Sequence, residues 1–239
     1  MKNSATSQYQ HWLNHPKMPA NFKAQLMALK PEQIDDAFFK DIEFGTAGMR
    51  GIMGLGTNRI NEFTIKKVTV AYGLLLRRLY PESLQRGVVI AHDNRRNANT
   101  YTALTSQILN EMGIHTYVFS ELVPTPLLSF AVRHLHCLGG IMLTASHNPK
   151  EYNGYKVYDD NGCQLVPHKI DALIEILSTL PEPLEMVTPS FEPKGSIKTV
   201  SKDLESTYVN LIKSLQLQPN LSKRDFKIIF SPQHGASYR

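Results

Sequence analysis

The chain has 239 residues, of which 42% are hydrophobic and 20% charged, and its formal net charge at pH 7 is +5. This length allows one large or two modest domains, and no stretch is long and apolar enough to predict a membrane span. The basic residues are scattered rather than gathered in one run, which favours a mixed solvated surface or phosphorylated metabolites over nucleic acid as a partner.

Two observations bear on the compartment. The first ten residues are polar and lack the apolar core of a signal peptide. The only cysteines, Cys137 and Cys163, lie far apart and show neither CxxC nor metal-ligand spacing. We therefore expect a cytoplasmic protein without a disulfide.

Residues 1–40 predict a helical leader. Apolar side chains form one cluster near residue 12 and then recur at spacings of four and three, as a helix facing a core requires. These residues are Tyr9, Trp12, Leu13, Phe22, Leu26 and Leu29. Prolines at positions 16, 19 and 31 divide the leader into pieces. We expect it to pack as a clasp on the main domain.

Residues 41–185 alternate between short apolar runs and helical patterns. After a glycine-rich loop at 44–51, the sequence predicts helices at 64–80, 99–112, about 123–136 and 166–180, and strands at 87–91, 115–119 and 140–143. Gly113 stands where the second helix should have its C-terminal cap. Strands that alternate with helices at these spacings predict a layered α/β domain with a mixed or parallel sheet.

The composition changes after residue 180. Residues 181–200 are rich in Pro, Glu, Ser and Thr, which favours a linker or an irregular edge segment, and we place the linker at 186–203. A helix near 202–215 and a strand at 226–230 follow. These are too few elements to close a core. We interpret 204–239 as the start of a second unit.

One segment carries the strongest functional signal. Residues 144–149 read Thr-Ala-Ser-His-Asn-Pro, and residues 152–156 read Tyr-Asn-Gly-Tyr-Lys. An apolar run at 138–143 predicts a buried strand that delivers Ser146 to a tight loop, since Asn and Pro favour a turn. A phosphoserine there would carry a charge of roughly −2 and need cations nearby. We interpret the Asn-Gly pair as a turn that folds Lys156 back toward this serine.

Ser146 has two other interpretations. A serine in an ordinary turn is the common case for an isolated Ser-His pair, but this pattern extends over residues 144–156. A serine hydrolase would need a GxSxG elbow and an acid partner, and neither is evident. We therefore favour phosphoryl chemistry.

Two further segments accompany the serine loop. Residues 44–51 read Phe-Gly-Thr-Ala-Gly-Met-Arg-Gly and match neither a P-loop nor GxGxxG. Residues 93–96 read Asp-Asn-Arg-Arg and follow a predicted strand. An ion pair that stabilises the loop is the expected role of this segment, and the alternative is that Arg95 faces the cleft.

Taken in this order, the three segments resemble the α-D-phosphohexomutases, the phosphoglucomutase/phosphomannomutase family. The resemblance implies a layered α/β/α domain with a mixed sheet at 41–185, followed by the start of a second similar domain. In this family four domains surround one cleft and supply, in turn, the phosphoserine, an Asp-x-Asp-x-Asp loop for Mg²⁺, the groups that read the sugar hydroxyls, and the grip on the substrate phosphate. The sequence of residues 152–158 and the long leader are more similar to the phosphoglucomutase or phosphopentomutase branch of the family.

The resemblance also implies residue roles. Ser146 would carry the phosphoryl group between positions 1 and 6 of a hexose phosphate and bind one Mg²⁺ ion through its phosphate. Arg50 and Lys156 would neutralise charge on the transferring group, and Lys156 could also handle the proton of the attacking hydroxyl. His147 completes the candidate catalytic set. The remaining residues are expected to bind the substrate or its phosphate: Thr144, Asn148 and Arg95.

The chain departs from the family pattern in one respect. No Asp-x-Asp-x-Asp follows Ser146, although the His-Gly at 234–235 resembles the loop before that metal site. We therefore interpret the chain as an N-terminal fragment that needs the C-terminal domains and a hexose 1,6-bisphosphate primer, and expect little turnover from it alone. The expected partner is a phosphosugar, with no nucleic acid or membrane. Phosphopentomutase, phosphomannomutase and a non-catalytic phosphate-binding module derived from a mutase domain remain alternatives.

Overall fold

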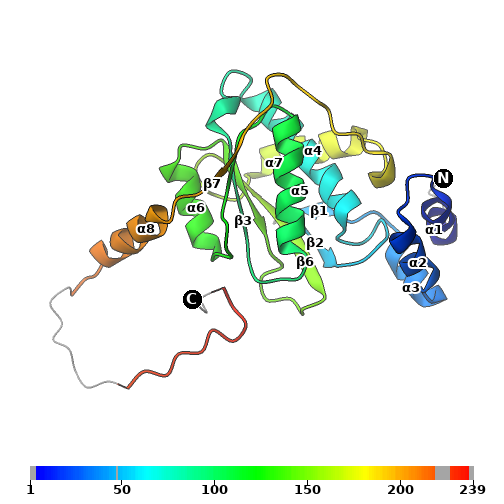
Figure 1. Cartoon of the computed structure of the whole chain (residues 1–239), viewed down its shortest axis with the longest axis horizontal. Helices are drawn as coiled ribbons and strands as arrows, with labels where there is room; N and C mark the ends of the chain where they lie inside the picture. The colour runs from blue at the N-terminus through cyan, green and yellow to red at the C-terminus, as the bar shows by residue number, and fades with distance from the viewer. Residues whose placement is uncertain (1–3, 47, 219–226, 237–239) are drawn as a thin grey trace.

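A mixed seven-stranded sheet with helices on both faces forms the body of the computed structural model, which describes residues 4–46, 48–218 and 227–236 (Figure 1). The strand order is β1-β2-β6-β5-β3-β4-β7. The strands are β1 (Phe44–Gly45), β2 (Gly48–Ile52), β3 (Val88–His92), β4 (Thr116–Val118), β5 (Gly139–Leu143), β6 (Tyr152–Tyr158) and β7 (Ile197–Thr199). The predicted α/β class and mixed sheet are confirmed.

The sheet has two halves that differ in strand direction. Strands β5, β3, β4 and β7 run parallel, whereas β6, β2 and β1 are antiparallel to their neighbours. All residues of β3 and β5 are buried, because helices cover both faces of the parallel half. The two halves meet between β5 and β6, and the serine loop joins these two strands.

Four helices predicted from the sequence are present with slightly shifted ends. They are α4 (Glu62–Leu79), α5 (Ala98–Glu111), α6 (Thr125–His134) and α7 (Pro167–Thr179). The Asn61 side chain caps α4 by accepting the N–H groups of Phe63 and Thr64. Gly113 adopts φ +77° just after α5, as expected for a C-terminal cap. A 3₁₀ turn, η1 (Leu84–Arg86), precedes β3.

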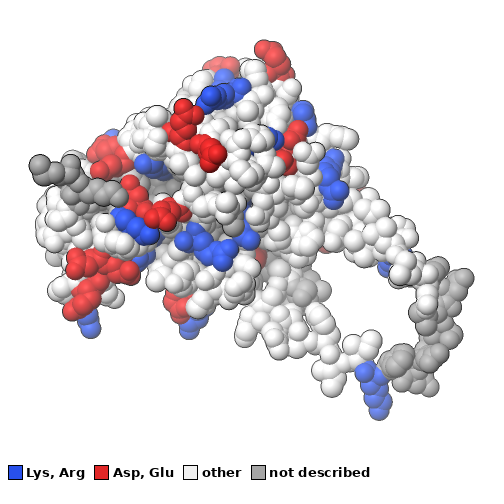
Figure 2. All heavy atoms as spheres, turned by 180° about the vertical axis from the view of Figure 1, so that it is seen from behind, with Lys and Arg blue, Asp and Glu red and all other residues white. Residues whose placement is uncertain are grey.

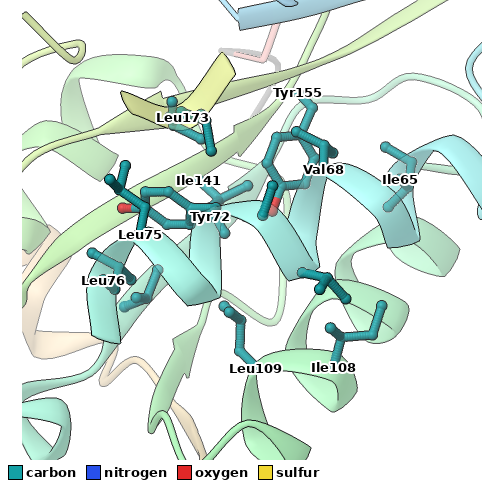
Figure 3. Close-up of a cluster of buried hydrophobic side chains, with 14 of the residues drawn as sticks. Ile65, Val68, Tyr72, Leu75, Leu76, Ile108, Leu109, Ile141, Tyr155 and Leu173 are labelled. Carbon is teal, nitrogen blue, oxygen red and sulfur yellow. The ribbon is translucent and has the colours of Figure 1, made fainter. Parts of the chain in front are cut away.

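Two apolar layers hold the helices to the sheet. Helices α4, α5 and α7 cover one face, where Tyr72 and Tyr155 lie fully buried among aliphatic side chains (Figure 3). Helix α6 covers the other face. The buried hydroxyls are satisfied, since Tyr72 donates to the Tyr158 carbonyl at 2.9 Å and Thr69 donates to the Tyr155 hydroxyl at 3.0 Å. Helices packed on both faces of the sheet give the domain its α/β/α layers.

The leader folds into three short helices at one end of the sheet, α1 (Ala5–Asn14), α2 (Ala20–Met27) and α3 (Pro31–Phe38). Their apolar sides enclose Trp12, which is fully buried and meets the rings of Phe38 and Phe63 edge-on at 5.6 and 5.3 Å. Phe63 belongs to α4, so the leader packs on the main domain as the sequence predicts. His15 adds a 2.7 Å contact to Glu185 in η2 (Pro183–Glu185).

The interval 186–203, where a linker is expected, contributes a strand to the sheet. Strand β7 pairs in parallel with β4, and the Gly195 N–H donates to the Asn110 carbonyl at 2.9 Å. The guanidinium of Arg77 lies 3.6 Å from the centre of the Phe191 ring. This strand has only three residues, all exposed, within a Pro- and Ser-rich stretch, so no apolar alternation signals it.

The C-terminal part differs from expectation in one element. The predicted helix is present as α8 (Asp203–Ser214), and Tyr208 contacts Phe130 of α6 with ring centres 5.3 Å apart. Of the strand predicted at 226–230, Phe226 lies outside the described residues and 227–230 do not form a strand. Residues 227–230 have no pairing partner in the described part of the chain, and a strand requires one.

Two further predictions about loops are wrong. The glycine-rich segment 44–51, apart from Ala47, which lies outside the described residues, forms the β1–β2 hairpin. Asn153 and Gly154 lie inside strand β6 rather than in a turn. Strand pairing with β5, and not a turn at Asn-Gly, carries Lys156 back toward the serine loop, because Lys156 lies opposite Met142.

The surface agrees with the scattered charge of the sequence. Basic and acidic side chains are interspersed over the face shown in Figure 2. Within the described ranges, no helix combines the length and apolarity needed to cross a bilayer.

Phe38→Ala should release the leader at lower denaturant than the native chain. The side chain is 1% exposed and packs against Trp12, so its loss should cost about 3–5 kcal/mol. Trp12 is the only tryptophan, so its fluorescence during urea titration reports on this cluster directly. The neighbouring Phe39 is 54% exposed, and Phe39→Ala should change stability by less than about 0.5 kcal/mol. Equal effects of the two substitutions would contradict this packing.

Candidate active site

The polar segments singled out in the sequence meet at the carboxyl ends of β3 and β5. His92 pairs with Leu143 in the parallel ladder, so the next residues, Asp93 and Thr144, enter neighbouring loops side by side. In open α/β sheets this edge is the usual position of ligand sites. The register of two buried strands therefore brings the 93–96 segment against the 144–149 loop.

Ser146 has an unusual backbone. Its φ is +57°, in the left-handed region that residues with a side chain avoid at a cost of about 1–2 kcal/mol. The side chain is exposed, and its hydroxyl lies 3.3 Å from Nδ1 of His147. Such strain persists only where the surroundings enforce it, and it concentrates at functional sites.

Thr144 fixes the amino side of this residue. Its hydroxyl accepts the Ser146 N–H at 3.0 Å and donates to Oδ2 of Asp93. The other carboxylate oxygen of Asp93 accepts the Arg95 N–H at 3.1 Å. Thr144 is 4% exposed, so these bonds are formed largely away from water. Thr144 acts on the loop backbone here, whereas the sequence places it among phosphate-binding residues.

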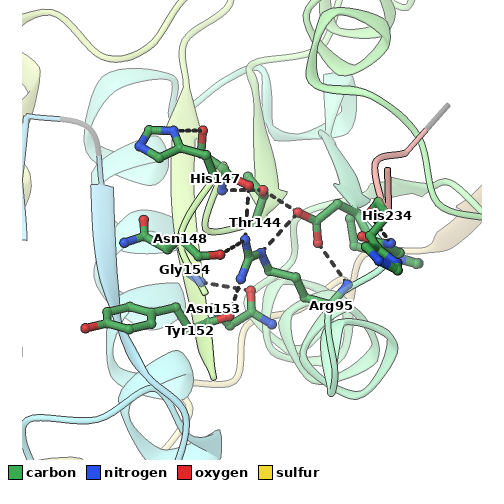
Figure 4. A network of polar contacts seen from close by, with 12 residues as sticks. Arg95, Thr144, His147, Asn148, Tyr152, Asn153, Gly154 and His234 are labelled. Carbon is green, nitrogen blue, oxygen red and sulfur yellow. Dashed lines mark hydrogen bonds and ion pairs between the residues drawn. The ribbon is translucent and has the colours of Figure 1, made fainter. Parts of the chain in front are cut away.

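Arg95 fixes the carboxyl side of the loop (Figure 4). Its Nη1 donates to the carbonyls of Pro149 and Tyr152 at 2.8 Å, and its Nη2 to those of Ser146 and Asn148 at 3.0 and 2.7 Å. Its Nε lies 3.4 Å from Asp93. These hydrogen bonds support the loop-stabilising role expected from the sequence, and Arg95 also lines the cleft beside the loop.

Arg50 and Lys156 lie on one face of the antiparallel half. Arg50 pairs with Gly154 across the β2–β6 ladder, and Lys156 is two residues further along β6 on the same face. Gly154 lets the backbone of β6 lie close to the Thr144 carbonyl, because a Cβ at position 154 would be only 2.7 Å from that oxygen. Arg50 Nη1 donates to Oδ1 of Asn148 at 2.8 Å, and this bond links strand β2 to the serine loop.

The surroundings of Lys156 lower the pKa of its side chain. Partial burial lowers the pKa of its ammonium group, and the nearby positive charge of Arg50 lowers the pKa further, while Asp93 opposes both effects. A lysine with a lowered pKa gives up its proton more easily near neutral pH. This property suits a residue that handles a proton beside the serine.

The serine loop lines a cleft of about 930 Å³. Its other walls come from the 93–96 segment, the start of α6 and residues 233–236. The Asn94 amide donates to the His234 carbonyl, so the His-Gly segment reaches this cleft. Segments that are far apart in the sequence therefore share one hollow.

The described residues do not by themselves fit a Mg²⁺ site. Among them, no group of three His, Cys, Asp or Glu side chains could hold a metal ion, and Asp93 is already engaged by Thr144 and Arg95. Mg²⁺ prefers oxygen ligands in an octahedral arrangement. A phosphate on Ser146 would supply one such ligand, and carboxylates would have to come from elsewhere.

One supporting residue escaped the sequence analysis. Asn153 is fully buried in β6, where its amide donates to the Arg96 carbonyl at 3.0 Å and its oxygen accepts the Gly154 N–H at 2.8 Å. A polar residue inside an otherwise buried strand is the signal that could have revealed it. The structure thus adds Asn153 to the residues that hold the site. It links Arg50, Thr144, Arg95, His147 and Asn148 around Ser146, and it places Lys156 on the sheet face that carries Arg50.

Comparison with known proteins gives one consistent result. Residues 41–183 match the model of the phosphoglucomutase/phosphomannomutase α/β/α domain I. The chain is 32% identical over its whole length to a phosphomannomutase of Mycoplasma pneumoniae, of which it covers 44%. It is 36% identical over 86% of its length to a phosphoglucomutase of Staphylococcus saprophyticus and 38% identical over 68% to a phosphopentomutase of Mus musculus, covering 37% and 27% of those proteins.

Solved structures agree with these matches. A Thermus thermophilus structure described as a phosphomannomutase aligns with a TM-score of 0.59 and 33% identity, over 75% of this chain and 37% of that one. The chain therefore spans less than half the length of each of these relatives.

Thr144→Val should destabilise the serine loop. It removes a hydroxyl that satisfies both Asp93 and the Ser146 N–H, which should cost about 1–3 kcal/mol in urea unfolding and speed hydrogen exchange at that N–H. Thr102→Val is the matched control, because the buried Thr102 hydroxyl has no hydrogen-bond partner among the described residues. That control should be neutral or slightly stabilising, and a cost equal to that of Thr144→Val would argue against the network.

The ε-amino pKa of Lys156 should lie below the ordinary value of 10.5 and should rise in Arg50→Gln, where a repelling charge is lost. NMR titration of the lysine side chains, assigned with Lys156→Met, measures both values. Because the folded pKa is the lower one, the free energy of unfolding should increase as pH rises from the lowered pKa to 10.5. Lys156→Met should remove this increase. An unchanged Lys156 pKa in Arg50→Gln would contradict the coupling.

Proposed function

Because the chain belongs to the phosphoglucomutase/phosphomannomutase family, we propose that it is the phosphoserine-bearing part of a phosphosugar mutase, with Ser146 as the phosphoryl carrier. The observation that carries this proposal is the exposed, left-handed Ser146, held on one side by Thr144 and on the other by Arg95. An ordinary turn serine needs no such support.

The proposed transfer involves one bond exchange. The bond between the Ser146 oxygen and phosphorus breaks as a sugar hydroxyl oxygen bonds to the same phosphorus, and the reverse exchange at the other end of the sugar restores the phosphoserine. The sugar hydroxyl loses a proton and the departing serine oxygen gains one, so the step balances. Lys156 is the residue we assign to this proton, because its pKa is lowered beside the loop.

Positive charge supports the transfer. A phosphoserine and a substrate phosphate together bring several negative charges into one cleft. Arg50 and Lys156 share the face beside the loop, and Arg50 also orients Asn148. Fixed cations of this kind stabilise a transferring phosphoryl group without reorganisation. His147, next to the hydroxyl of Ser146, is assigned to hold the phosphate.

The proposal extends to a hexose 1-phosphate and 6-phosphate as substrates, with a hexose 1,6-bisphosphate as primer and a cytoplasmic location. Relatives named phosphoglucomutase, phosphomannomutase and phosphopentomutase match comparably well, so a pentose or mannose phosphate is the alternative. Mg²⁺ belongs to the proposal for the complete mutase, with carboxylate ligands from outside the described residues. For the same reason we expect little turnover from residues 1–239 alone.

Incubation of the purified chain with glucose 1,6-bisphosphate and Mg²⁺ should add one phosphoryl group, located on Ser146 by intact mass and peptide mapping. Ser146→Ala should accept none, whereas Ser178→Ala, which alters an exposed serine on α7, should behave like the native chain. Steady conversion of glucose 1-phosphate to glucose 6-phosphate should be slight.

Two results would count against the proposal. A phosphoryl group on another residue, or none on the native chain, would remove Ser146 as the carrier. Phosphosugar binding that survives Ser146→Ala, without any phosphoryl acceptance by the native chain, would favour a non-catalytic phosphate-binding module.

A further inference from the structure

Asn153 is an unusual residue for the interior of a strand. Asparagine is depleted in strands, yet this side chain lies fully buried in β6. A buried amide is costly unless both of its polar ends are bonded, and here both are. The Asn153 oxygen accepts the Gly154 N–H at 2.8 Å, and the Asn153 nitrogen donates to the Arg96 carbonyl at 3.0 Å. Each of these bonds has its own consequence for the serine loop.

The oxygen of Asn153 ends the pairing of β5 with β6. Thr144 and Gly154 continue the register of these strands, and the Thr144 N–H donates to the Gly154 carbonyl at 3.2 Å. In a regular antiparallel pair of this kind, the Gly154 N–H would return a bond to the Thr144 carbonyl. Here that N–H donates to the Asn153 side chain instead. The Thr144 carbonyl is therefore released from the ladder, and the chain leaves the sheet two residues before Ser146.

The nitrogen of Asn153 acts on the neighbouring loop. It holds the carbonyl of Arg96, the residue that directly follows Arg95. Arg95 in turn donates to the carbonyls of Ser146 and Asn148 at 3.0 and 2.7 Å. A bond from β6 to this backbone fixes where the Arg95 side chain begins, and the rigid fork of the guanidinium carries that position to the serine loop.

Both bonds of Asn153 converge on the backbone of Ser146. One frees the chain on the amino side of the serine, and the other anchors the arginine that holds its carboxyl side. The left-handed φ of +57° at Ser146 persists only if the surroundings enforce it. Asparagine suits this position because one planar group supplies both an acceptor and a donor, whereas leucine of similar size supplies neither.

We propose that Asn153 is a positioning residue for phosphoryl transfer at Ser146, because it ends the β5–β6 ladder where the serine loop begins and ties the Arg95 segment to β6. The inference rests on the proposed function, since it concerns the rate at which Ser146 accepts a phosphoryl group. Asn153 acts through the loop backbone and not on the reacting atoms. Position matters at a nucleophile, because a misplacement of about 1 Å can lower a rate about 100-fold.

The rate at which Ser146 gains a phosphoryl group tests the inference. The chain is incubated with Mg²⁺ and a range of glucose 1,6-bisphosphate concentrations, and the intact mass is followed over time. Asn153→Leu removes both bonds, so the maximal rate should fall by about tenfold or more. The half-saturating bisphosphate concentration should change little, because Arg50 and Lys156 remain on their sheet face.

A thermal melt establishes that the leucine variant is folded. Asn153→Ser is the second variant, since its smaller side chain leaves room for water to take the place of the amide. It should also lower the maximal rate.

Asn61→Leu is the matched control. Asn61 is likewise a buried asparagine whose side chain bonds backbone groups at both ends, but it lies at the start of α4, outside the lining of the serine cleft. This variant should lose stability and keep the native maximal rate. Equal losses of rate in Asn61→Leu and Asn153→Leu, or a native rate in a folded Asn153 variant, would overturn the positioning role.

Hydrogen exchange at the Ser146 N–H separates this inference from the proposed function. The Thr144 hydroxyl accepts that N–H at 3.0 Å, and exchange should be faster in Asn153→Leu than in the native chain or in Asn61→Leu. A native chain that accepts no phosphoryl group would remove the proposed function, while the exchange rate would still decide whether Asn153 shapes the loop. Unchanged exchange in Asn153→Leu would refute the inference.

Discussion

The geometry of the serine loop depends on the guanidinium of Arg95. One planar group donates to four loop carbonyls and lies beside Asp93, and this arrangement offsets the cost of the left-handed backbone at Ser146. The five donors of arginine sit in a rigid fork, so lysine could not replace this pattern. These bonds hold the backbone of the loop in the conformation that exposes Ser146 to the cleft.

The mixed sheet supplies the second half of the site. A purely parallel sheet would place helices between successive strands, whereas the tight connection from β5 to the antiparallel β6 returns the chain directly beside the loop. Strand β2 then adds Arg50 next to Lys156, and Gly154 leaves room for the backbones to approach. The change of strand direction thus brings residues about one hundred positions apart onto one face.

The two ends of the chain differ in how they are held. The leader is anchored by buried aromatic contacts around Trp12 and belongs to the packed structure. Beyond β7, helix α8 touches α6 mainly through Leu204 and Tyr208, and residues 228–230 are largely exposed apolar side chains. Packing, rather than local helix propensity, makes this difference, because both ends contain well-formed helices.

The sequence by itself determined the helices, the buried strands, the serine loop and the family, because periodicity, turn residues and short motifs are local signals. Only the tertiary structure decided that residues 197–199 join the sheet, that Asn153 and Gly154 lie in a strand, and which loop carbonyls accept hydrogen bonds from Arg95. Each of these depends on partners distant in sequence. Strand pairing and the destination of a side chain's hydrogen bonds are properties of the assembled fold, so no local pattern could reveal them.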